Sequence, residues 1–241
     1  MFPIRYDDIK AHKNEIMPEI KRFNQCDYII CHNKQMSKRL AMLGCTAQMV
    51  PLTIFDYFTE DFIPKERPLT IPCISFAGNL GKSPFLKKLD QSVDTSVLQF
   101  HVYGMPQAQY SNLFYCGSLP ADQLPLLIEG NYGLIWEGGY EVHERNNYLR
   151  YNNPHKASLY ITAGLPIIVW SKAAIADFVQ EHKLGICLDS LDELEEKITS
   201  VSQEEYQMLR ENCLKLRHSL INGNYIKDAL NHILFFSENQ P

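Results

Sequence analysis

Two turns that carry a lysine offer the most definite chemistry in this sequence. The first is Asn152-Asn153-Pro154-His155-Lys156, which has the features of a helix start. Asn153 is a favoured N-cap residue, and Pro154 suits the first helical position because its missing N–H is not needed there. Lys156 then lies in the first turn, where the helix dipole already concentrates positive charge. Free N–H groups, the dipole and an ammonium group together predict a site for an anion such as pyrophosphate.

Arg150, just before this turn, would add a planar pair of donors that suits phosphate oxygens. The same residues also fit a simpler interpretation, in which a capped surface helix carries solvated basic side chains. Local rules alone leave these two interpretations evenly balanced. His155 titrates near neutral pH, but its position favours a role in shaping the helix entrance over a role as a catalytic base.

A second candidate for anion binding is Gly78-Asn79-Leu80-Gly81-Lys82-Ser83, where a predicted strand gives way to a helix. Glycine lets the backbone approach phosphate closely, Asn79 lies in the turn, and Lys82 supplies charge. The segment lacks the G-x-x-x-x-G-K-[ST] spacing of a nucleotide-triphosphate loop. Taken alone, it is more simply explained as an ordinary strand-to-helix turn.

Glu137 and Tyr115 complete the set of candidate ligand-binding residues. Glu137 directly follows a predicted strand, and ligands of open α/β sheets bind beyond the carboxyl ends of strands. Glu137 would meet a sugar or ribose hydroxyl there; the alternative is a solvated loop carboxylate. Tyr115 and Tyr103 would stack on a base, although aromatic side chains near strand ends more often belong to the core.

The elements that must position these residues form an alternating series of strands and helices. Short apolar runs predict five strands and one extended segment, at 73–77, 98–103, 132–136, 166–170, 185–188 and 113–117 respectively. Helices are predicted between them, including one over 153–163. Strands that alternate with helices are typical of a parallel sheet, and about five strands suffice for a complete Rossmann-like domain.

The first part of the chain offers fewer elements. A polar helix is predicted over 7–22, broken near Pro18. Strands at 26–31 and 49–54 flank a second helix at 34–43. Two strands are too few for an independent sheet of this kind.

Prolines separate the two series. Pro64 and Pro68 lie among charged residues, where they cannot donate to a sheet ladder and disfavour helix before them. We therefore predict a partial N-terminal domain with a linker over 1–67, a second domain over 68–224, and a C-terminal helix over 225–241 that crosses back to the first domain. The alternative for the linker is a long surface loop within one domain.

Composition excludes several classes of protein. The chain has 241 residues, 45% of them hydrophobic, and a formal net charge of −5, which is typical of a globular protein without the basic footprint of nucleic-acid binding. No apolar run reaches the roughly 18 residues that span a bilayer, and the N-terminus lacks the apolar core of a signal peptide. The seven cysteines form no C-x-x-C pair and no zinc spacing. These features predict free thiols, a cytoplasmic location and no metal site.

Several segments together resemble a known family. The segments are Phe2-Pro3-Ile4-Arg5, Cys31-His32-Asn33-Lys34-Gln35-Met36, Ile54-Phe55-Asp56-Tyr57, Phe76-Ala77-Gly78-Asn79-Leu80, Gly133-Leu134-Ile135-Trp136-Glu137-Gly138 and Asn152-Asn153-Pro154-His155-Lys156. They are similar to bacterial GT-B glycosyltransferases that include the second glucosyltransferase of serine-rich adhesins and related β-1,6-galactofuranosyltransferases. The last segment, followed by Gly-Leu-Pro, is the most specific.

The resemblance implies an α/β fold of GT-B type, with a complete C-terminal Rossmann-like domain that binds the nucleotide sugar. It implies a UDP-sugar donor, a glycan or glycoprotein acceptor, a homo-oligomer, and transfer without a metal or other cofactor. It further implies that Lys82, Asn153 and Lys156 hold the UDP diphosphate, and that Arg150 also contacts the UDP-sugar. Family members carry roughly 90–100 further residues before the Phe-Pro-Ile-Arg segment, about half a domain. The N-terminal Rossmann-like domain is therefore expected to be partial and the chain truncated, and no catalytic base is assigned.

Three functional hypotheses follow. The first is transfer of glucose, galactofuranose or another hexose from UDP to a sugar hydroxyl. The second is a non-catalytic fragment or partner subunit that binds the UDP-sugar but lacks the acceptor half. The third, a nicotinamide-dependent oxidoreductase, is weaker because no G-x-G-x-x-G segment follows any predicted strand.

Overall fold

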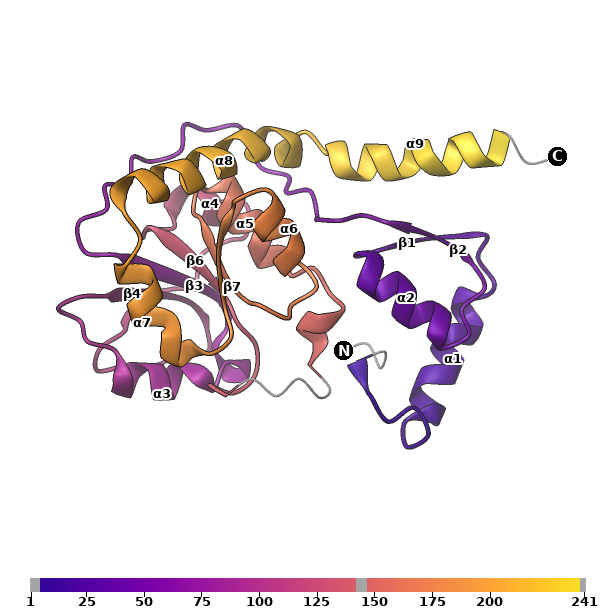
Figure 1. Ribbon diagram of the computed structural model, residues 1–241, viewed down its shortest axis with the longest axis horizontal. Coiled ribbons are helices and arrows are strands. Elements are labelled where there is room, and N and C mark those ends of the chain that lie inside the picture. The colour runs from indigo at the N-terminus through magenta and orange to yellow at the C-terminus, as the bar shows by residue number, and fades with distance from the viewer. Residues whose placement is uncertain (1–4, 142–146, 239–241) are drawn as a thin grey trace.

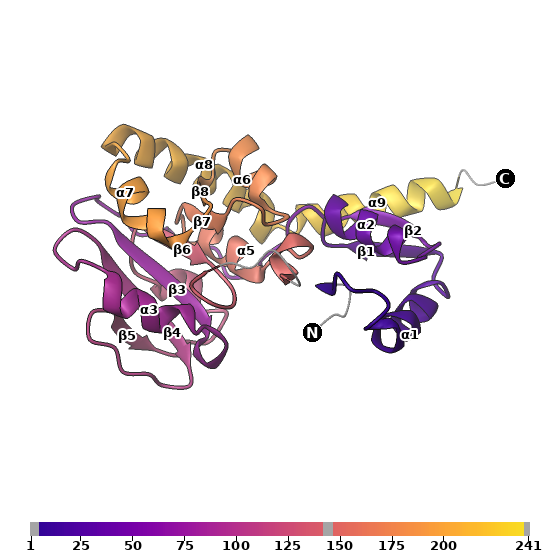
Figure 2. The ribbon, with the colours of Figure 1, turned by 60° about the horizontal axis from the view of Figure 1, so that its bottom comes forward.

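A computed structural model describes residues 5–141 and 147–238 of the chain. In chain order its helices and strands are α1 Lys13–Phe23, β1 Tyr28–Cys31, α2 Lys34–Met42, β2 Gln48–Pro51, β3 Cys73–Asn79, α3 Phe85–Ser92, β4 Gln99–Met105, β5 Phe114–Gly117, α4 Leu124–Leu127, β6 Tyr132–Ile135, α5 His155–Thr162, β7 Ile167–Trp170, α6 Ala176–Glu181, β8 Gly185–Leu188, α7 Leu194–Thr199, α8 Gln203–Ile221 and α9 Asn224–Glu238. Three 3₁₀ helices lie between them, namely η2 Leu80–Lys82, η3 Tyr148–Arg150 and η4 Leu191–Glu193. We call residues 13–53, from α1 to just after β2, the N-terminal lobe and β3 to α8 the C-terminal domain, and we refer to the two together as the two lobes. In both Figure 1 and Figure 2, α9 extends from the C-terminal domain along the N-terminal lobe.

The C-terminal domain contains a six-stranded sheet that is parallel throughout, in the order β5-β4-β3-β6-β7-β8. The chain first builds outward from β3 to β5 and then returns to place β6 on the other side of β3. The strand order therefore reverses between β3 and β6. In sheets of this kind, ligands bind beyond the carboxyl ends of the strands at such a switch point.

The structure confirms the predicted α/β class and parallel sheet. The segment predicted only as extended forms β5 and pairs with β4, which makes six strands where about five were predicted. Every residue of β6 and β7 is buried. Helices cover both faces of such a sheet, which explains why these strands appear in the sequence as continuous apolar runs without alternation.

The N-terminal lobe is built around a two-stranded parallel sheet of β1 and β2. One buried cluster of this lobe includes Ile16 of α1, Cys31 of β1 and Leu40 of α2. A second, smaller cluster joins Val50 and Leu52 to Ala229 of α9. Within the described part of the chain, β1 and β2 pair only with each other, so each strand has one free edge.

Helix α1 differs from the predicted broken helix, because it continues through Pro18. Proline removes one backbone hydrogen bond, but Asn14, whose carbonyl group is freed, is exposed, so water can bind that group. Ile16 and Ile20 are almost fully buried and hold the helix on the lobe. Tertiary packing thus outweighs the local cost of proline.

The proline-rich segment between the two lobes lies along the C-terminal domain as an extended strap. Arg67 is buried and donates to the carbonyl oxygens of Gly130 (2.6 Å) and Ile128 (2.9 Å). Farther along the strap, the Tyr57 hydroxyl donates to the carbonyl oxygen of Ala121 (2.6 Å). None of the helices in the described ranges combines the length and apolar character that crossing a bilayer requires.

Candidate functional site

Helix α5 is fixed on the sheet so that its first turn lies at the switch point. The Tyr160 ring packs directly on Gly133 of β6, where an added Cβ atom would approach the ring to 2.1 Å. The Tyr160 hydroxyl accepts from the Ala77 amide (2.9 Å) and donates to the carbonyl oxygen of Leu134 (3.2 Å). This side chain therefore ties α5 to both β3 and β6, one turn after Lys156.

Lys156 extends from the start of α5 to the carboxyl end of β3. Its Nζ atom lies 4.4 Å from the centroid of the Phe76 ring, an aromatic face that attracts a cation. A Cβ atom on Gly78 would come within 2.9 Å of Lys156 Cε, so only glycine leaves room for this path. Burial lowers the pKa of Lys156 from 10.5 to about 8, because the ammonium group has lost much of its water. The prediction from sequence placed this lysine at an anion site, and the structure places it in a poorly solvated crevice.

Glu137 faces Lys156 from the end of β6. Its side chain is partly buried, and the loss of water raises its pKa, while the charges of Lys156 and Arg5 lower it. Lys156 and Glu137 thus face each other from distant parts of the chain, and Arg5 is near enough for its charge to act on Glu137. Arg5 was not among the predicted site residues; its signal was the Phe-Pro-Ile-Arg segment, of which Phe2, Pro3 and Ile4 lie outside the described residues.

A cavity of about 350 Å³ adjoins this crevice on the β3–β4 side. Its walls are Ala77, Gly78, Asn79, Tyr103, Gly104, Met105, Ser118, Leu119, Ala121, Leu124 and Leu159. Asn79 lines it and also caps η2 by accepting from the Lys82 amide (3.2 Å). Tyr115 lies beside it and donates to the carbonyl oxygen of Gly104 (3.1 Å). The Lys82 side chain is exposed at the end of η2.

Asn153 is not the N-cap of α5 that the sequence predicted. Helix α5 begins at His155 with Pro154 as its N-cap, and the Asn153 side chain makes no cap bond. Only 2% of Asn153 is exposed, and its amide group bonds to Asn33, His32 and Thr53 of the N-terminal lobe instead. The structure therefore engages this side chain with protein groups, which argues against direct contact with a ligand.

Arg150 likewise turns toward the N-terminal lobe. Its guanidinium group forms an ion pair with Asp7 (3.3 Å) and lies over the Tyr151 ring. The predicted phosphate donor is thus engaged with a carboxylate. Neighbouring Asn152 was missed as a candidate: its buried Oδ1 atom has no hydrogen-bond partner in the described residues, and the Asn-Asn-Pro-His-Lys segment was the available signal.

Three rings line the contact between the two lobes. His155 stacks on Phe55 with 4.2 Å between ring centroids, and Phe55 meets His32 edge-on at 4.8 Å. Burial lowers the pKa of His32, and the nearby His155 lowers it further. Neutral His32 can accept at Nδ1, and it does so from the Asn153 amide (3.2 Å). The predicted role of His155 in shaping the helix entrance agrees with this packing.

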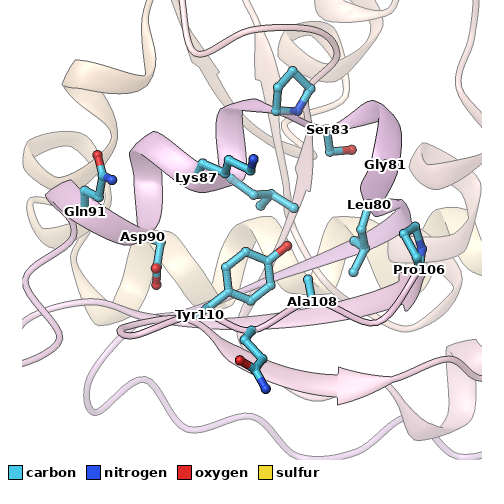
Figure 3. Close-up of a pocket in the computed structure, with 12 residues that line it drawn as sticks. Leu80, Gly81, Ser83, Lys87, Asp90, Gln91, Pro106, Ala108 and Tyr110 are labelled. Carbon is cyan, nitrogen blue, oxygen red and sulfur yellow. The ribbon is translucent and has the colours of Figure 1, made fainter.

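A larger cavity of about 580 Å³ lies between α3 and the loop after β4 (Figure 3). Tyr110 and Lys87 line it, together with Asp90. The Asp90 carboxylate accepts from the Asn112 amide (2.7 Å) and the Ser111 amide (3.0 Å), so it serves to hold the loop. This cavity shares no lining residue with the one beside Gly78. Of the predicted site residues, Asn79 lines the cavity beside Gly78, whereas Gly81 and Ser83, on either side of Lys82, line the larger one.

The chain was also compared with known proteins. Residues 74–233 match the family described as "Glucosyltransferase 3-like, C-terminal domain", and residues 2–54 match the corresponding N-terminal domain. The chain belongs to the glucosyltransferase 3-like family. This confirms the family to which the sequence segments pointed.

Two curated relatives illustrate the match. The chain is 31% identical to the β-1,6-galactofuranosyltransferase WbbI of Escherichia coli K12, over 88% of this chain and 65% of WbbI. It is 29% identical to glucosyltransferase 3 of Streptococcus gordonii, over 95% of this chain and 66% of that protein. The chain thus spans just under two thirds of the length of these relatives.

Solved structures share the fold. Sucrose-phosphate synthase from Thermosynechococcus elongatus superposes with a TM-score of 0.72 at 13% identity, covering 98% of this chain and 65% of that one. Anabaena HepE in complex with UDP-glucose gives 0.65 at 10% identity, covering 99% and 71%. The GT-B type predicted from the sequence is confirmed.

Proposed function

We propose that the chain binds a UDP-sugar in the crevice between β3, β6 and the start of α5, and that it serves the transfer of a hexose to a sugar hydroxyl of a glycan or glycoprotein. The observation that carries this proposal is Lys156, a lysine held at a helix start in a poorly solvated crevice at the switch point of the sheet. Glucose and galactofuranose are the sugars named in its relatives. A homo-oligomeric state and a cytoplasmic location stay predictions.

The arrangement suits the departure of UDP. Negative charge grows on the diphosphate as the bond to the sugar breaks, and the first amides of α5 have no partner within the helix. Together with the Lys156 ammonium group, they would stabilise that charge without having to reorganise. Glu137, which lies near Lys156, would accept from a sugar hydroxyl. Asn79, Tyr115 and Lys82 would contact the rest of the nucleotide.

We expect the chain to bind UDP and UDP-hexoses more tightly than NAD. Lys156 suits a diphosphate, and no glycine-rich dinucleotide segment follows β3 or β6. Isothermal titration calorimetry with UDP, UDP-glucose and NAD measures the three affinities. Equal or tighter binding of NAD would contradict the proposed function.

We also expect any transfer activity to survive EDTA. A divalent cation would need paired carboxylates, and the described residues contain no group of three His, Cys, Asp or Glu side chains suited to holding one. Transfer from a UDP-hexose is measured with and without chelator. Activity that is lost on chelation and restored by Mg²⁺ or Mn²⁺ would show that Lys156 and α5 do not suffice.

We propose as the alternative function that the chain binds a UDP-sugar without transferring it. Transfer assays of this chain beside one extended to the length of the relatives distinguish the two functions. UDP binding without transfer in this chain alone, with transfer by the extended chain, identifies the second.

A further inference from the structure

We propose that Asn33 and Asn153 are positioning residues, which clamp the two lobes together and thereby hold the start of α5 and Lys156 in place. With His32 and Thr53 they form a network that we call the interlobe clamp. The inference rests on the proposed binding of a UDP-sugar. It assigns Asn153 a role through protein contacts, with no direct contact to the diphosphate.

Asn153 reaches across to both strand ends of the N-terminal lobe. Its Nδ2 atom donates to the carbonyl oxygens of His32, just after β1, and of Thr53 (2.6 Å), just after β2. Its backbone amide donates to His32 Nδ1 (3.2 Å). A single buried residue thus binds the lobe at two points, three positions before Lys156.

Asn33 makes the matching hydrogen bonds from the N-terminal lobe. Its Nδ2 atom donates to Asn153 Oδ1 (2.8 Å) and to the carbonyl oxygen of Tyr151 (3.0 Å). Its Oδ1 atom accepts from the Met36 amide (2.9 Å) and so caps α2. Both donors and the acceptor of this amide are therefore used, and only 7% of Asn33 is exposed.

Thr53 shows that the clamp holds a conformation that the backbone would not adopt freely. Its φ angle is +75°, in the left-handed region that a β-branched residue rarely enters. The Thr53 carbonyl oxygen accepts from Asn153 in this conformation. Strain of this kind persists only where surrounding contacts enforce it, and it often marks functional sites.

The clamp controls one end of α5, as Tyr160 controls the other. Tyr160 fixes the helix on the sheet, while Asn153 fixes the chain that enters it. Lys156 lies between these two anchors.

The test uses Asn33→Ser, Asn153→Ala and the double variant, with UDP and uridine as probes. Serine still caps α2, but its side chain is too short to reach Asn153. The matched control is Asn24→Ala, since Asn24 also donates to and accepts from backbone groups, Gly44 O and Thr46 N, but within its own lobe. Calorimetry gives the affinities, and hydrogen exchange of the ligand-free protein reports on residues 153–158.

We expect each clamp variant to lower the affinity for UDP about tenfold, which is the scale of lost buried hydrogen bonds. The affinity for uridine should fall much less. The double variant should be within about twofold of either single variant, because both break one network. Asn24→Ala should bind like the wild type. Exchange at 153–158 should quicken in both clamp variants.

Two results would overturn the clamp. If Asn153→Ala loses UDP affinity while Asn33→Ser keeps it, Asn153 contacts the ligand directly. If the two losses multiply in the double variant, the residues act separately. A wild type that binds no UDP would refute the proposed function instead, and the ligand-free exchange would still decide whether the clamp holds α5.

Discussion

Replacing Lys156 with methionine is expected to make the unliganded protein more stable while removing most of its affinity for UDP. Methionine has a similar length and no charge, so it fills the same path beside Gly78 and Phe76. The affinity should fall by about 1.5–3 kcal/mol, the scale of a hydrogen bond to a charged group. Uridine, which lacks the diphosphate, should lose much less.

The gain in stability follows from the pKa of Lys156. Its folded-state value of about 8 lies below the ordinary 10.5, so folding disfavours the charged form. That difference corresponds to roughly 3 kcal/mol. Because the side chain keeps some contact with water, we expect a gain of about 1–2 kcal/mol. For a base with a lowered pKa, the cost is fully present below pH 8 and disappears as the pH rises towards 10.5. The advantage of the methionine variant should therefore be largest at neutral pH.

Chemical denaturation between pH 7 and pH 10 measures this difference. Lys87→Met is the matched control, because Lys87 is exposed on α3 outside the crevice. It should change neither stability nor UDP affinity. A Lys156→Met protein that is less stable than the wild type at pH 7 would mean that Lys156 serves the fold. Equal losses of affinity for UDP and for uridine would mean that Lys156 does not bind the diphosphate.

The same lysine shows what local rules can predict. A lysine in the first turn of a helix opposes the dipole, and such an unfavourable placement is detectable in the sequence alone. The strands β6 and β7 could also be predicted from their apolar runs, because strands buried on both faces need no polar positions. Local rules therefore found these strands and marked the lysine, but they left its role balanced between an anion site and a solvated helix surface.

Asn153 and Arg150 show where local rules stop. The first has the ideal type for an N-cap, yet its amide bonds to Thr53, 100 positions away in sequence. The second pairs with Asp7, which is 143 positions away. A polar side chain near the contact between the lobes can form its hydrogen bonds within its own lobe or across the contact. The spacing of residues in the sequence cannot distinguish these two outcomes. The segment His32-Asn33 belongs to one of the family motifs, but only the structure shows that its hydrogen-bond partner is Asn153.

Amide hydrogen exchange is expected to be much faster through β1 and β2 than through the strands of the C-terminal domain. The two strands form an isolated parallel pair, and neither has a further neighbour in the described residues. Parallel sheets are normally larger and covered on both faces. The central strands β3 and β6 instead have a strand on each side and a core that includes the fully buried Trp136.

The free energy of local opening depends on this difference in neighbouring strands and buried core. Amides in a small unit with free strand edges exchange through local opening, which costs little free energy. Amides in a large core exchange only through openings whose free energy approaches that of global unfolding. We expect protection factors for residues 28–51 to lie at least about a hundredfold below those for 73–79 and 132–135. The amides of Leu52 and Thr53 should be the slowest near the N-terminal lobe, since they donate to the carbonyl oxygens of Cys31 and His32 beside the interlobe clamp.

Mass spectrometry of the 241-residue chain can resolve these segments after proteolysis at low pH. Measurements at several protein concentrations are the control, because a second copy that covers the free edges would slow exchange as concentration rises. Uniform protection at every concentration would contradict the expectation. It would mean that the contacts with α9, through Val50, Leu52 and Ala229, and the interlobe clamp are enough to make the two-stranded lobe open only together with the domain it contacts.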